Sequence, residues 1–317
     1  MPAAINTART TERLNFLTAK ILSKEPMDAY FEKYPVLDYF WDNKETDVYG
    51  NQIEQKLDTG NSPNFRWFEG VGTTFTTTIK NTVRNSVYDM KDCGITLVID
   101  HKEIMEASSS DEKAYSIAKN RKDNAQNTIR EALNTALVAT GNATDRIIGI
   151  PNLVDATSTA IGNFNRTTDT FFQAQVTSSI GAFATNGLTN MRTGRNLVKQ
   201  EKGNTPDFGI TTRTIHESFE AQLDPDVRYS QSKKLERGAM DLIWSGFPVE
   251  FSQHLTSGEM YFLTKEAIKM YVDSRANMAF EPYLKGQDNI SIVAKILLRL
   301  CVATFSPREL WKGTGIT

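Results

Sequence analysis

The stretch that decides the fold runs from Ser108 to Gly141 and reads SSSDEKAYSIAKNRKDNAQNTIREALNTALVATG. Its small and apolar residues recur at spacings of three, four and seven, and its charged and amide residues fall on the other side. The apolar stripe consists of Ala114, Ala118, Ala125, Ile129, Ala132, Leu133 and Ala136, and the polar side of Glu112, Lys119, Asp123, Asn127 and Arg130. This pattern predicts one amphipathic helix over about 109–140, roughly 45 Å long at a rise of about 1.5 Å per residue.

Both ends of this helix carry boundary signals. Ser109 followed three residues later by Glu112 is a capping box, and Gly141 is a typical left-handed stop. A stripe made mostly of alanine allows a helix to lie close against a sheet. Arg121 and Lys122 interrupt the stripe near its edges, so we expect a bend or a contact with another subunit there.

Composition describes an ordinary globular chain. With 317 residues, about two domains with their own cores are expected, and a net charge of -2 gives no basic excess of the kind that marks a dedicated nucleic-acid reader. No apolar run approaches the roughly 18 residues of a membrane span, and the first residues lack the apolar region of a secretory signal. Two cysteines, Cys93 and Cys301, are too few for a disulfide framework and are expected to be reduced and structural.

The first 46 residues are rich in aromatic side chains, namely Tyr30, Phe31, Tyr34, Tyr39, Phe40 and Trp41. A segment this short cannot build a core of its own, so these rings must pack on something else. From the sequence, two partners are open: the rest of the same chain, or a neighbouring subunit across which the segment lies as an arm.

The next segment, Val48 to Lys80, favours extended structure. Ile53, Gln55 and Leu57 give one short extended piece and Phe65 to Phe68 another, joined by the turn-forming residues 58–63. We expect a protruding hairpin here, continued by the Thr-rich stretch 73–79. A hairpin alone is barely stable in water, which indicates that it finds a partner surface.

The remaining chain alternates between strand and helix patterns, which indicates an α/β layer in its middle part. Expected strands are Gly94 to His101, Asp207 to Thr212, Phe247 to Phe251, Met260 to Leu263, Ile268 to Val272 and Ile292 to Val302, and expected helices are Ile180 to Lys202 and Arg213 to Gln222. The two strands on either side of the Ser257-Gly258 turn form a strand-turn-strand unit. A short final strand near Leu310 to Ile316 is expected to complete the sheet of Ile292 to Val302, which covers the long helix.

Chemical motifs are nearly absent, and we therefore predict no catalytic, no cofactor-binding and no metal-binding residues. The three histidines, His101, His216 and His254, stand apart from cysteines and paired carboxylates, so structural roles are favoured over zinc or base roles. No GxGxxG, P-loop or GxSxG sequence occurs. Asp224 and Asp226 flank Pro225 in a DPD sequence that a simple turn explains better than a cation site.

Several phrases, in their order, resemble the major capsid proteins of tailed bacteriophages, the Hong Kong 97-type fold. The arm, hairpin, strand and long helix are followed by IIGIPNLV (147–154) and IGNFNRTTDTFF (161–172), then by PDFGITTRTIHESFEA (206–221) and FPVEFSQHLTSGEMYFLT (247–264). The resemblance covers nearly the whole chain. It implies an α+β chain with an N-terminal arm at 1–46 and an extended hairpin loop at 47–86. A peripheral domain, formed by 87–151 and 265–317, carries the spine helix at about 109–140, and an axial α/β domain covers 152–264.

The function implied by this resemblance is a structural, non-enzymatic one. Such chains form hexamers and pentamers that close an icosahedral head shell around packaged double-stranded DNA without reading its sequence. A portal protein would occupy one vertex, and the location would be the virion capsid, assembled in the host bacterial cytoplasm with no membrane involved. We expect separate scaffolding and decoration proteins or none, and a subunit that starts near its encoded N-terminus.

Three further readings remain open from the sequence. An encapsulin-like bacterial compartment that encloses protein cargo is the alternative within the same fold. A rival from another class is an enzyme with a site near Asp207 and His216, although motif support for it is nearly absent. Some members of the family weld the hairpin to a neighbour through a Lys to Asn isopeptide bond, and here Lys56 could face Asn277 or Asn289, although no motif fixes that chemistry.

Overall fold

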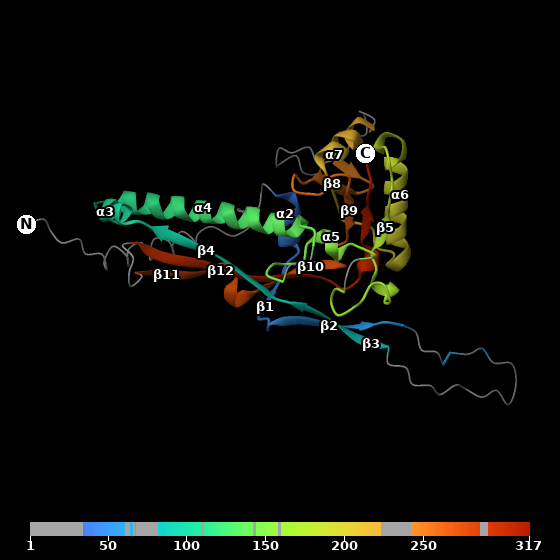
Figure 1. Ribbon diagram of the computed structural model, residues 1–317, viewed down its shortest axis with the longest axis horizontal. Coiled ribbons are helices and arrows are strands. Elements are labelled where there is room, and N and C mark those ends of the chain that lie inside the picture. The colour runs from blue at the N-terminus through green and yellow to red at the C-terminus, as the bar shows by residue number, and fades with distance from the viewer. Residues whose placement is uncertain are drawn as a thin grey trace, which may run out of the picture.

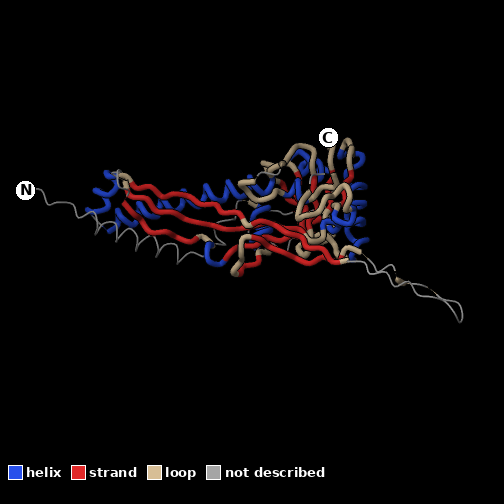
Figure 2. Tube along the Cα trace, turned by 60° about the horizontal axis from the view of Figure 1, so that its bottom comes forward, coloured by secondary structure: helices blue, strands red, loops and turns tan. Residues whose placement is uncertain are grey.

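The computed structural model describes residues 34–60, 64–65, 67, 82–109, 111–141, 144–157, 160–222, 242–285 and 291–317. These residues form an α+β structure with two sheets and a projecting two-stranded ribbon (Figures 1 and 2). The helices are α2 (Pro35–Asp42), α3 (His101–Ser109), α4 (Asp111–Val138), α5 (Ile150–Leu153), α6 (Phe183–Lys202) and α7 (Arg213–Gln222). The 3-10 turns of the described residues are η2 (Thr170–Phe172), η4 (Ser274–Ala276) and η5 (Pro307–Glu309).

The first sheet lies under the long helix α4, as Figure 1 shows. Its centre is the 13-residue strand β12 (Ile292–Thr304), which pairs along one side with β4 (Lys91–Ile99). Along the other side of β12 lie β11 (Ala279–Lys285) and β10 (Ile268–Asp273), and β1 (Glu45–Asp47) pairs with β10. The period-two pattern of the sequence predicted β12 correctly, because its alternate residues are buried against the helix.

Helix α4 confirms the expected long helix over 28 residues, with differences at its start and on its polar side. Ser109 is the last residue of α3, so helical structure begins at His101 and the capping pattern did not mark its start. Gly141 has a φ of 90°, as expected for a stop. We expected Arg130 on the exposed side of the helix, but it is buried. The helix has a second row of buried residues at a spacing of four, which consists of Lys122, Gln126, Arg130 and Asn134.

The residues expected to mark a bend or a subunit contact are used within the same chain. Arg121 forms a 2.5 Å ion pair with Glu103 of α3, and Lys122 is fully buried. The helix continues through both positions without interruption.

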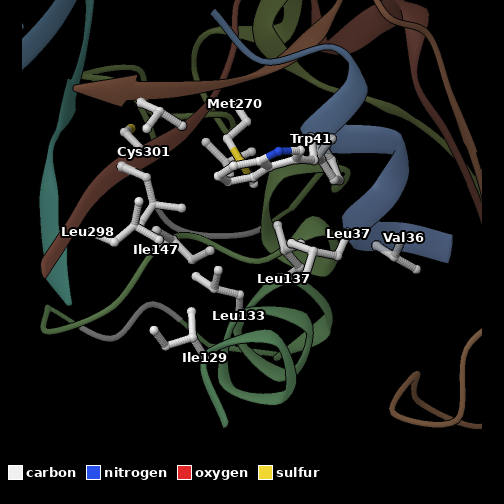
Figure 3. Packing of buried hydrophobic residues seen from close by; sticks show 14 of the residues in the cluster. Val36, Leu37, Trp41, Ile129, Leu133, Leu137, Ile147, Met270, Leu298 and Cys301 are labelled. Atoms are coloured by element: carbon white, nitrogen blue, oxygen red, sulfur yellow. The ribbon is translucent and has the colours of Figure 1, made fainter. Parts of the chain in front are cut away.

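Helix α2 resolves part of the question of where the N-terminal aromatic residues pack. Figure 3 shows Trp41 beside Met270 of β10, and Leu37 beside Leu137 of α4. Tyr39, Phe40 and Trp41 are all buried. Tyr39, Phe40 and Trp41 therefore pack on their own chain, which answers for these rings the question that the sequence left open. The boundary of the arm at residue 46 stays a prediction. Tyr30 and Phe31 lie outside the described residues.

The second sheet has six strands in the order β5 (Gln175–Thr177), β13 (Trp311–Gly313), β9 (Met260–Leu263), β6 (Phe208–Thr211), β8 (Phe247–Phe251) and β7 (Leu242–Trp244). Helices α6 and α7 cover one face of it, where Phe183, Val198, Phe219 and Trp311 belong to a separate core. Strands β8 and β9 do not pair with each other as the strand-turn-strand expectation implied, because β6 lies between them. The final strand β13 belongs to this sheet rather than to that of β12, since its partners are β5 and β9.

The ribbon consists of β2 (Gln52–Asp58) and β3 (Val83–Asp89), paired antiparallel from Gln52 opposite Asp89 to Asp58 opposite Val83. The expected partner of the first strand was Phe65 to Phe68. That pairing is wrong, and the loop of the hairpin is correspondingly longer than the turn at 58–63. Of the loop, only 59–60, 64–65, 67 and 82 are described.

Candidate functional site

Most of the ribbon β2–β3 is exposed. Only Ile53, Ser86 and Tyr88 of its fourteen paired positions are buried, and the strands point away from the body in Figure 1. Tyr88 anchors the root, because its hydroxyl donates a 2.7 Å hydrogen bond to the Thr304 carbonyl. Seven cross-strand pairs at about 3.3 Å per residue give a ribbon of about 23 Å.

Two arginines, Arg275 of the turn η4 and Arg299 of β12, hold the chain just before the ribbon. Arg275 donates to the Tyr49 carbonyl, and Arg299 donates to the Gly50 carbonyl at 3.2 Å and to Asn51 Oδ1 at 2.8 Å. Arg299 also faces Asp92 at 3.5 Å. The entry to β2 is therefore fixed by guanidinium groups that bind backbone carbonyls.

Asp273 orients one of these arginines. Its carboxylate, with no solvent exposure, accepts hydrogen bonds from Arg275 Nη2 at 2.6 Å, from Arg275 Nε at 3.0 Å and from the Arg275 backbone N–H at 3.0 Å. These side-chain and backbone hydrogen bonds lower the pKa of Asp273 from 3.8 to about 2. The carboxylate therefore remains charged at all ordinary pH values and keeps the Arg275 fork directed toward Tyr49.

A third arginine holds the other strand of the ribbon. Arg84 of β3 forms a bidentate pair with Asp169, at 2.5 and 3.3 Å, and its guanidinium lies 4.6 Å from the centre of the Phe164 ring. The Val87 N–H donates to the Gly162 carbonyl at 3.4 Å. Together, Arg84, Arg275 and Arg299 form what we call the arginine clamps, which fix the direction of the ribbon.

The segment 161–172 contains Phe164 and Asp169, the partners of Arg84, and is held in place by a glycine turn and a buried arginine. Gly162 has a φ of 59°, and a Cβ there would lie 2.5 Å from Ser86 Oγ, so this turn needs glycine to approach the ribbon. Arg166 is fully buried and donates to the Asn152 and Leu153 carbonyls at 2.6 and 2.5 Å. Burial lowers the pKa of Arg166 from its ordinary value.

Beyond the ribbon, the described part of the loop carries an exposed aromatic pair. Phe65 and Trp67 are 74% and 86% exposed, and their rings meet edge to face with centres 5.4 Å apart. The large apolar residues that are exposed elsewhere are Val48, Val83, Val98, Met105, Val176, Phe251 and Leu284. Two adjacent aromatic rings this exposed indicate a surface for contact with another molecule.

An open groove of about 520 Å³ lies between β4 and the C-terminal half of α4. Its apolar lining includes Ile95, Ile129, Leu133 and Ile147, and Cys93 also lines it. Strand β4 pairs with β12 on one side, and none of the described strands pairs with its other side. The groove thus runs beside a free sheet edge, a common docking place for another chain.

The residues that the sequence singled out for chemistry do not come together. His216 Nε2 lies 3.2 Å from the Val249 carbonyl, and burial lowers the pKa of His216. The Asp207 carboxylate accepts a hydrogen bond from the Lys265 backbone N–H at 2.9 Å. His101 and His254 are exposed, and Asp224 and Asp226 lie outside the described residues. Among the described residues, no group of three His, Cys, Asp or Glu side chains could hold a metal ion. No described helix has the length and apolarity needed to cross a membrane.

The isopeptide hypothesis stays a prediction. Lys56 is exposed on β2, opposite Asn85 of β3, while Asn277 is half-buried and Asn289 lies outside the described residues. The arginine clamps were not anticipated from the sequence. Arginine at positions 84, 275 and 299 gives no local signal, because each binds a backbone or a carboxylate that is distant along the chain.

No protein-family model and no curated protein matches the sequence. Solved structures do match it. The capsid of an empty GTA particle superposes with a TM-score of 0.59 at 10% identity, covering 87% of this chain and 95% of that one. The capsid of cyanophage A-1(L) gives 0.59 at 11% identity, with 87% and 91% covered. A structure from Mycobacterium phage Cain gives 0.54 at 13% identity, with 88% of each chain covered.

An encapsulin complex from Synechococcus elongatus is also similar, with a TM-score of 0.55 at 10% identity, covering 89% of this chain and 88% of that one. At such identities the likeness concerns the fold. The likeness extends over most of this chain and of these capsid chains. The chain has the Hong Kong 97-type capsid fold.

Proposed function

We propose that this protein is the major capsid protein of a tailed double-stranded DNA bacteriophage, and that its work is structural rather than enzymatic. The observation that carries the proposal is the likeness of the fold to phage capsids over most of both chains. The exposed ribbon and its aromatic pair add to it, because they offer surface for neighbouring copies.

In this proposal, copies join as hexamers and pentamers into an icosahedral shell that encloses the genome without reading its sequence. The net charge of -2 fits such enclosure better than tight, specific DNA binding. A portal protein at one vertex, and separate scaffolding and decoration proteins, would complete the head. Assembly would take place in the host bacterial cytoplasm.

We also propose the corresponding domain roles. The first sheet with α4 would be the peripheral domain, the second sheet with α6 and α7 the axial domain, the ribbon the extended loop, and the residues before α2 the arm. The pairing of β13 with β5 and β9 supports an axial domain that would include the last residues of the chain in addition to 152–264.

Expression of the full chain in bacteria tests the proposal. Purified protein should form closed icosahedral particles or ring-shaped capsomers that electron microscopy resolves. A chain that stays monomeric at near-physiological salt, both alone and with the other head proteins of its source, would contradict it.

An encapsulin-like compartment is the second candidate, favoured by the similarity to the Synechococcus elongatus complex. The contents of native particles separate the two. Double-stranded DNA that survives external nuclease supports the phage head, whereas an enzyme cargo without DNA supports the compartment.

A further inference from the structure

Helix α6 differs in charge from the chain as a whole. It contains four basic residues and one acidic residue and therefore has a net charge of +3, whereas the whole chain has a net charge of -2. The four basic residues are Arg192, Arg195, Lys199 and Lys202. Positive charge that gathers on one element of a chain with negative net charge indicates a surface for an anionic partner.

The four basic residues lie along one side of the helix. Their spacings of three, four and three residues place them in one row, which we call the basic row. Each of the first three directly follows a buried residue, so the row runs beside the face that packs on the second sheet. The neighbouring exposed residues Thr193, Asn196 and Gln200 are uncharged. The exposed side of this part of α6 is thus basic or neutral, and Figure 1 shows the helix at the margin of the molecule.

Three members of the basic row carry a charge that the chain does not neutralise. The side chains of Arg192 and Lys199 are exposed and form no ion pair or hydrogen bond with described residues. The guanidinium of Arg195 donates to Ser245 Oγ and, at 3.1 Å, to Asn196 Oδ1. Because both of these partners are uncharged, they position Arg195 and leave its positive charge uncompensated.

The acidic groups near the end of α6 are already engaged. Glu201, the acidic residue of the helix, lies 3.2 Å from Arg308 and accepts a hydrogen bond from Gln175 at 3.3 Å. Glu309 is 1% exposed and pairs with Lys202 at 2.8 Å. Lys202 is therefore neutralised within the chain, and the other three cations of the basic row are left for a partner.

Double-stranded DNA complements this surface. Arg192 and Lys199 are seven residues apart, which is about 10 Å along a helix. A DNA duplex carries one negative charge per about 1.7 Å of its axis, so phosphates are available to every cation of the row whatever the base sequence. The threonine, asparagine and glutamine residues beside the row can donate hydrogen bonds to phosphate oxygens without adding negative charge.

We propose that Arg192, Arg195 and Lys199 of the basic row contact the phosphates of packaged double-stranded DNA. This inference rests on the proposed function, because it names the surface of the subunit that would face the enclosed genome. One subunit supplies only three cations, so the contact of a single copy is weak and independent of base sequence. The copies of a shell together supply many such contacts along the duplex.

The salt dependence of DNA binding measures the phosphate contacts. Full-chain capsomers and a short fluorescent DNA duplex are titrated at several salt concentrations, with fluorescence anisotropy as the readout. The logarithm of the affinity falls with the logarithm of the salt concentration, with a slope of about 0.9 per phosphate contact. Arg192→Gln combined with Lys199→Gln should lower this slope by about two, and equally for duplexes of different sequence.

Lys265→Gln combined with Lys285→Gln is the matched control. Both lysines are exposed, lie outside α6 and form no ion pair or side-chain hydrogen bond with described residues. This variant removes the same charge and should keep the slope of the wild type. An α6 variant with the wild-type slope would overturn the inference. A slope lowered equally by both pairs of substitutions would also overturn it, because net charge rather than the basic row would then account for the binding.

Assembled particles provide the second test. Wild-type particles filled with DNA and particles emptied of DNA are treated with a small reagent that acetylates lysines, and mass spectrometry of the digested protein gives the rate of reaction at each lysine. Lys199 should react several-fold more slowly in the filled particles, because bound phosphates shield its amine. Lys265 and Lys285 should react at the same rate in both.

The outcomes separate this inference from the proposed function. Filled particles in which Lys199 reacts as fast as in emptied ones would overturn the DNA contact and leave the proposed function intact. Protection of Lys199 by a bound acidic head protein, with or without DNA, would assign the basic row to that protein and likewise overturn the contact. Wild-type particles that never enclose DNA would overturn both.

Discussion

At the residue scale, Gly194 shows how a missing side chain positions a helix. A Cβ at this position of α6 would lie 2.5 Å from the ring of Trp311, which is fully buried on β13. The helix can therefore approach the second sheet only because this residue has no side chain. The sequence does not reveal this contact, since Trp311 lies on a strand more than a hundred residues later in the chain.

We expect Gly194→Ala to destabilise the protein. Alanine gains about 1 kcal/mol in helix propensity, but overpacking against a buried ring costs about 1–3 kcal/mol, so a net loss of about 1 kcal/mol is expected. Urea unfolding of the dissociated full-length protein would measure it. Gly50→Ala, where a Cβ would meet no atom within 4 Å, serves as control and should change the free energy by less than about 0.5 kcal/mol. A more stable Gly194→Ala protein would contradict the close approach.

Asp273 should make stability depend on pH in the acidic range. Its pKa is about 2 in the folded protein and 3.8 ordinarily, so the unfolded chain binds the proton first as pH falls. The stabilisation is thus complete above about pH 4 and is lost as pH falls toward 2. Asp273→Asn should reduce the free energy of unfolding at pH 7, and its difference from the wild type should shrink between pH 4 and 2.

Denaturant titrations at several pH values would show this convergence. Arg275→Gln should reproduce it, because Arg275 supplies the hydrogen bonds that lower the pKa of Asp273. Profiles of wild type and Asp273→Asn that stay parallel down to pH 2 would exclude the carboxylate as the source.

At the element scale, local patterns predicted most helices and strands but not their partners. The bounds expected for α7, β8 and β9 agree with the structure, because each is a short run with its own periodicity and turn residues. The pairing of β2 with β3 rather than with Phe65 to Phe68, and of β13 with β5 and β9, depends on contacts between distant segments. A hydrophobic pattern with a period of two predicts a strand, but it does not predict which strand lies beside it in the sheet.

Likewise, the sequence predicted only part of the candidate site. The sequence indicated an exposed extended piece at Phe65 to Phe68, because aromatic residues stand there among turn formers. It gave no indication of the groove, which is assembled from β4, α4 and the residues 145–147. Nor could it show that Lys122 and Arg130 are buried, since the burial of a charged residue depends on what packs over it.

Removing one arginine clamp should loosen the ribbon without unfolding the body. Arg84→Ala deletes the bidentate pair with Asp169 and the contact with Phe164, whereas the core of each sheet is untouched. Such partly exposed pairs are worth up to about 1 kcal/mol, so amide hydrogen exchange in β2 and β3 should accelerate up to about fivefold.

Arg213→Ala is the matched control for this experiment. Arg213 also forms an ion pair with a carboxylate, Glu217 at 2.8 Å, but this pair lies on α7, far from the ribbon in Figure 1. Exchange in β2 and β3 should be unaffected in that variant. Equal exchange in wild type and Arg84→Ala would show that Tyr88 and the other two clamps suffice to hold the ribbon.

At the scale of the whole molecule, α2 joins the two sheets. Tyr39 stacks on Phe208 of the second sheet, with ring centres 4.6 Å apart and planes 10° apart, while Leu37 and Trp41 of the same helix face α4 and β10 (Figure 3). One large hydrophobic cluster therefore runs from β12 through α2 to β6 and β9. A subunit pulled by its neighbours in a shell would transmit force through this contact, and the two sheets should unfold together.

Tyr39→Ala should uncouple them. Loss of a buried aromatic ring costs about 3 kcal/mol or more, and here the loss falls on the contact between the two halves. Scanning calorimetry of the dissociated protein should show one transition in the wild type and two in the variant. The matched control is Tyr39→Phe, because the Tyr39 hydroxyl is buried without a hydrogen-bond partner among the described residues and burial raises its pKa. Its removal should leave one transition at an equal or higher temperature, since an unpaired buried hydroxyl stabilises nothing. A single transition in Tyr39→Ala, merely lowered in temperature, would mean that other parts of the cluster join the sheets without the Tyr39–Phe208 stack.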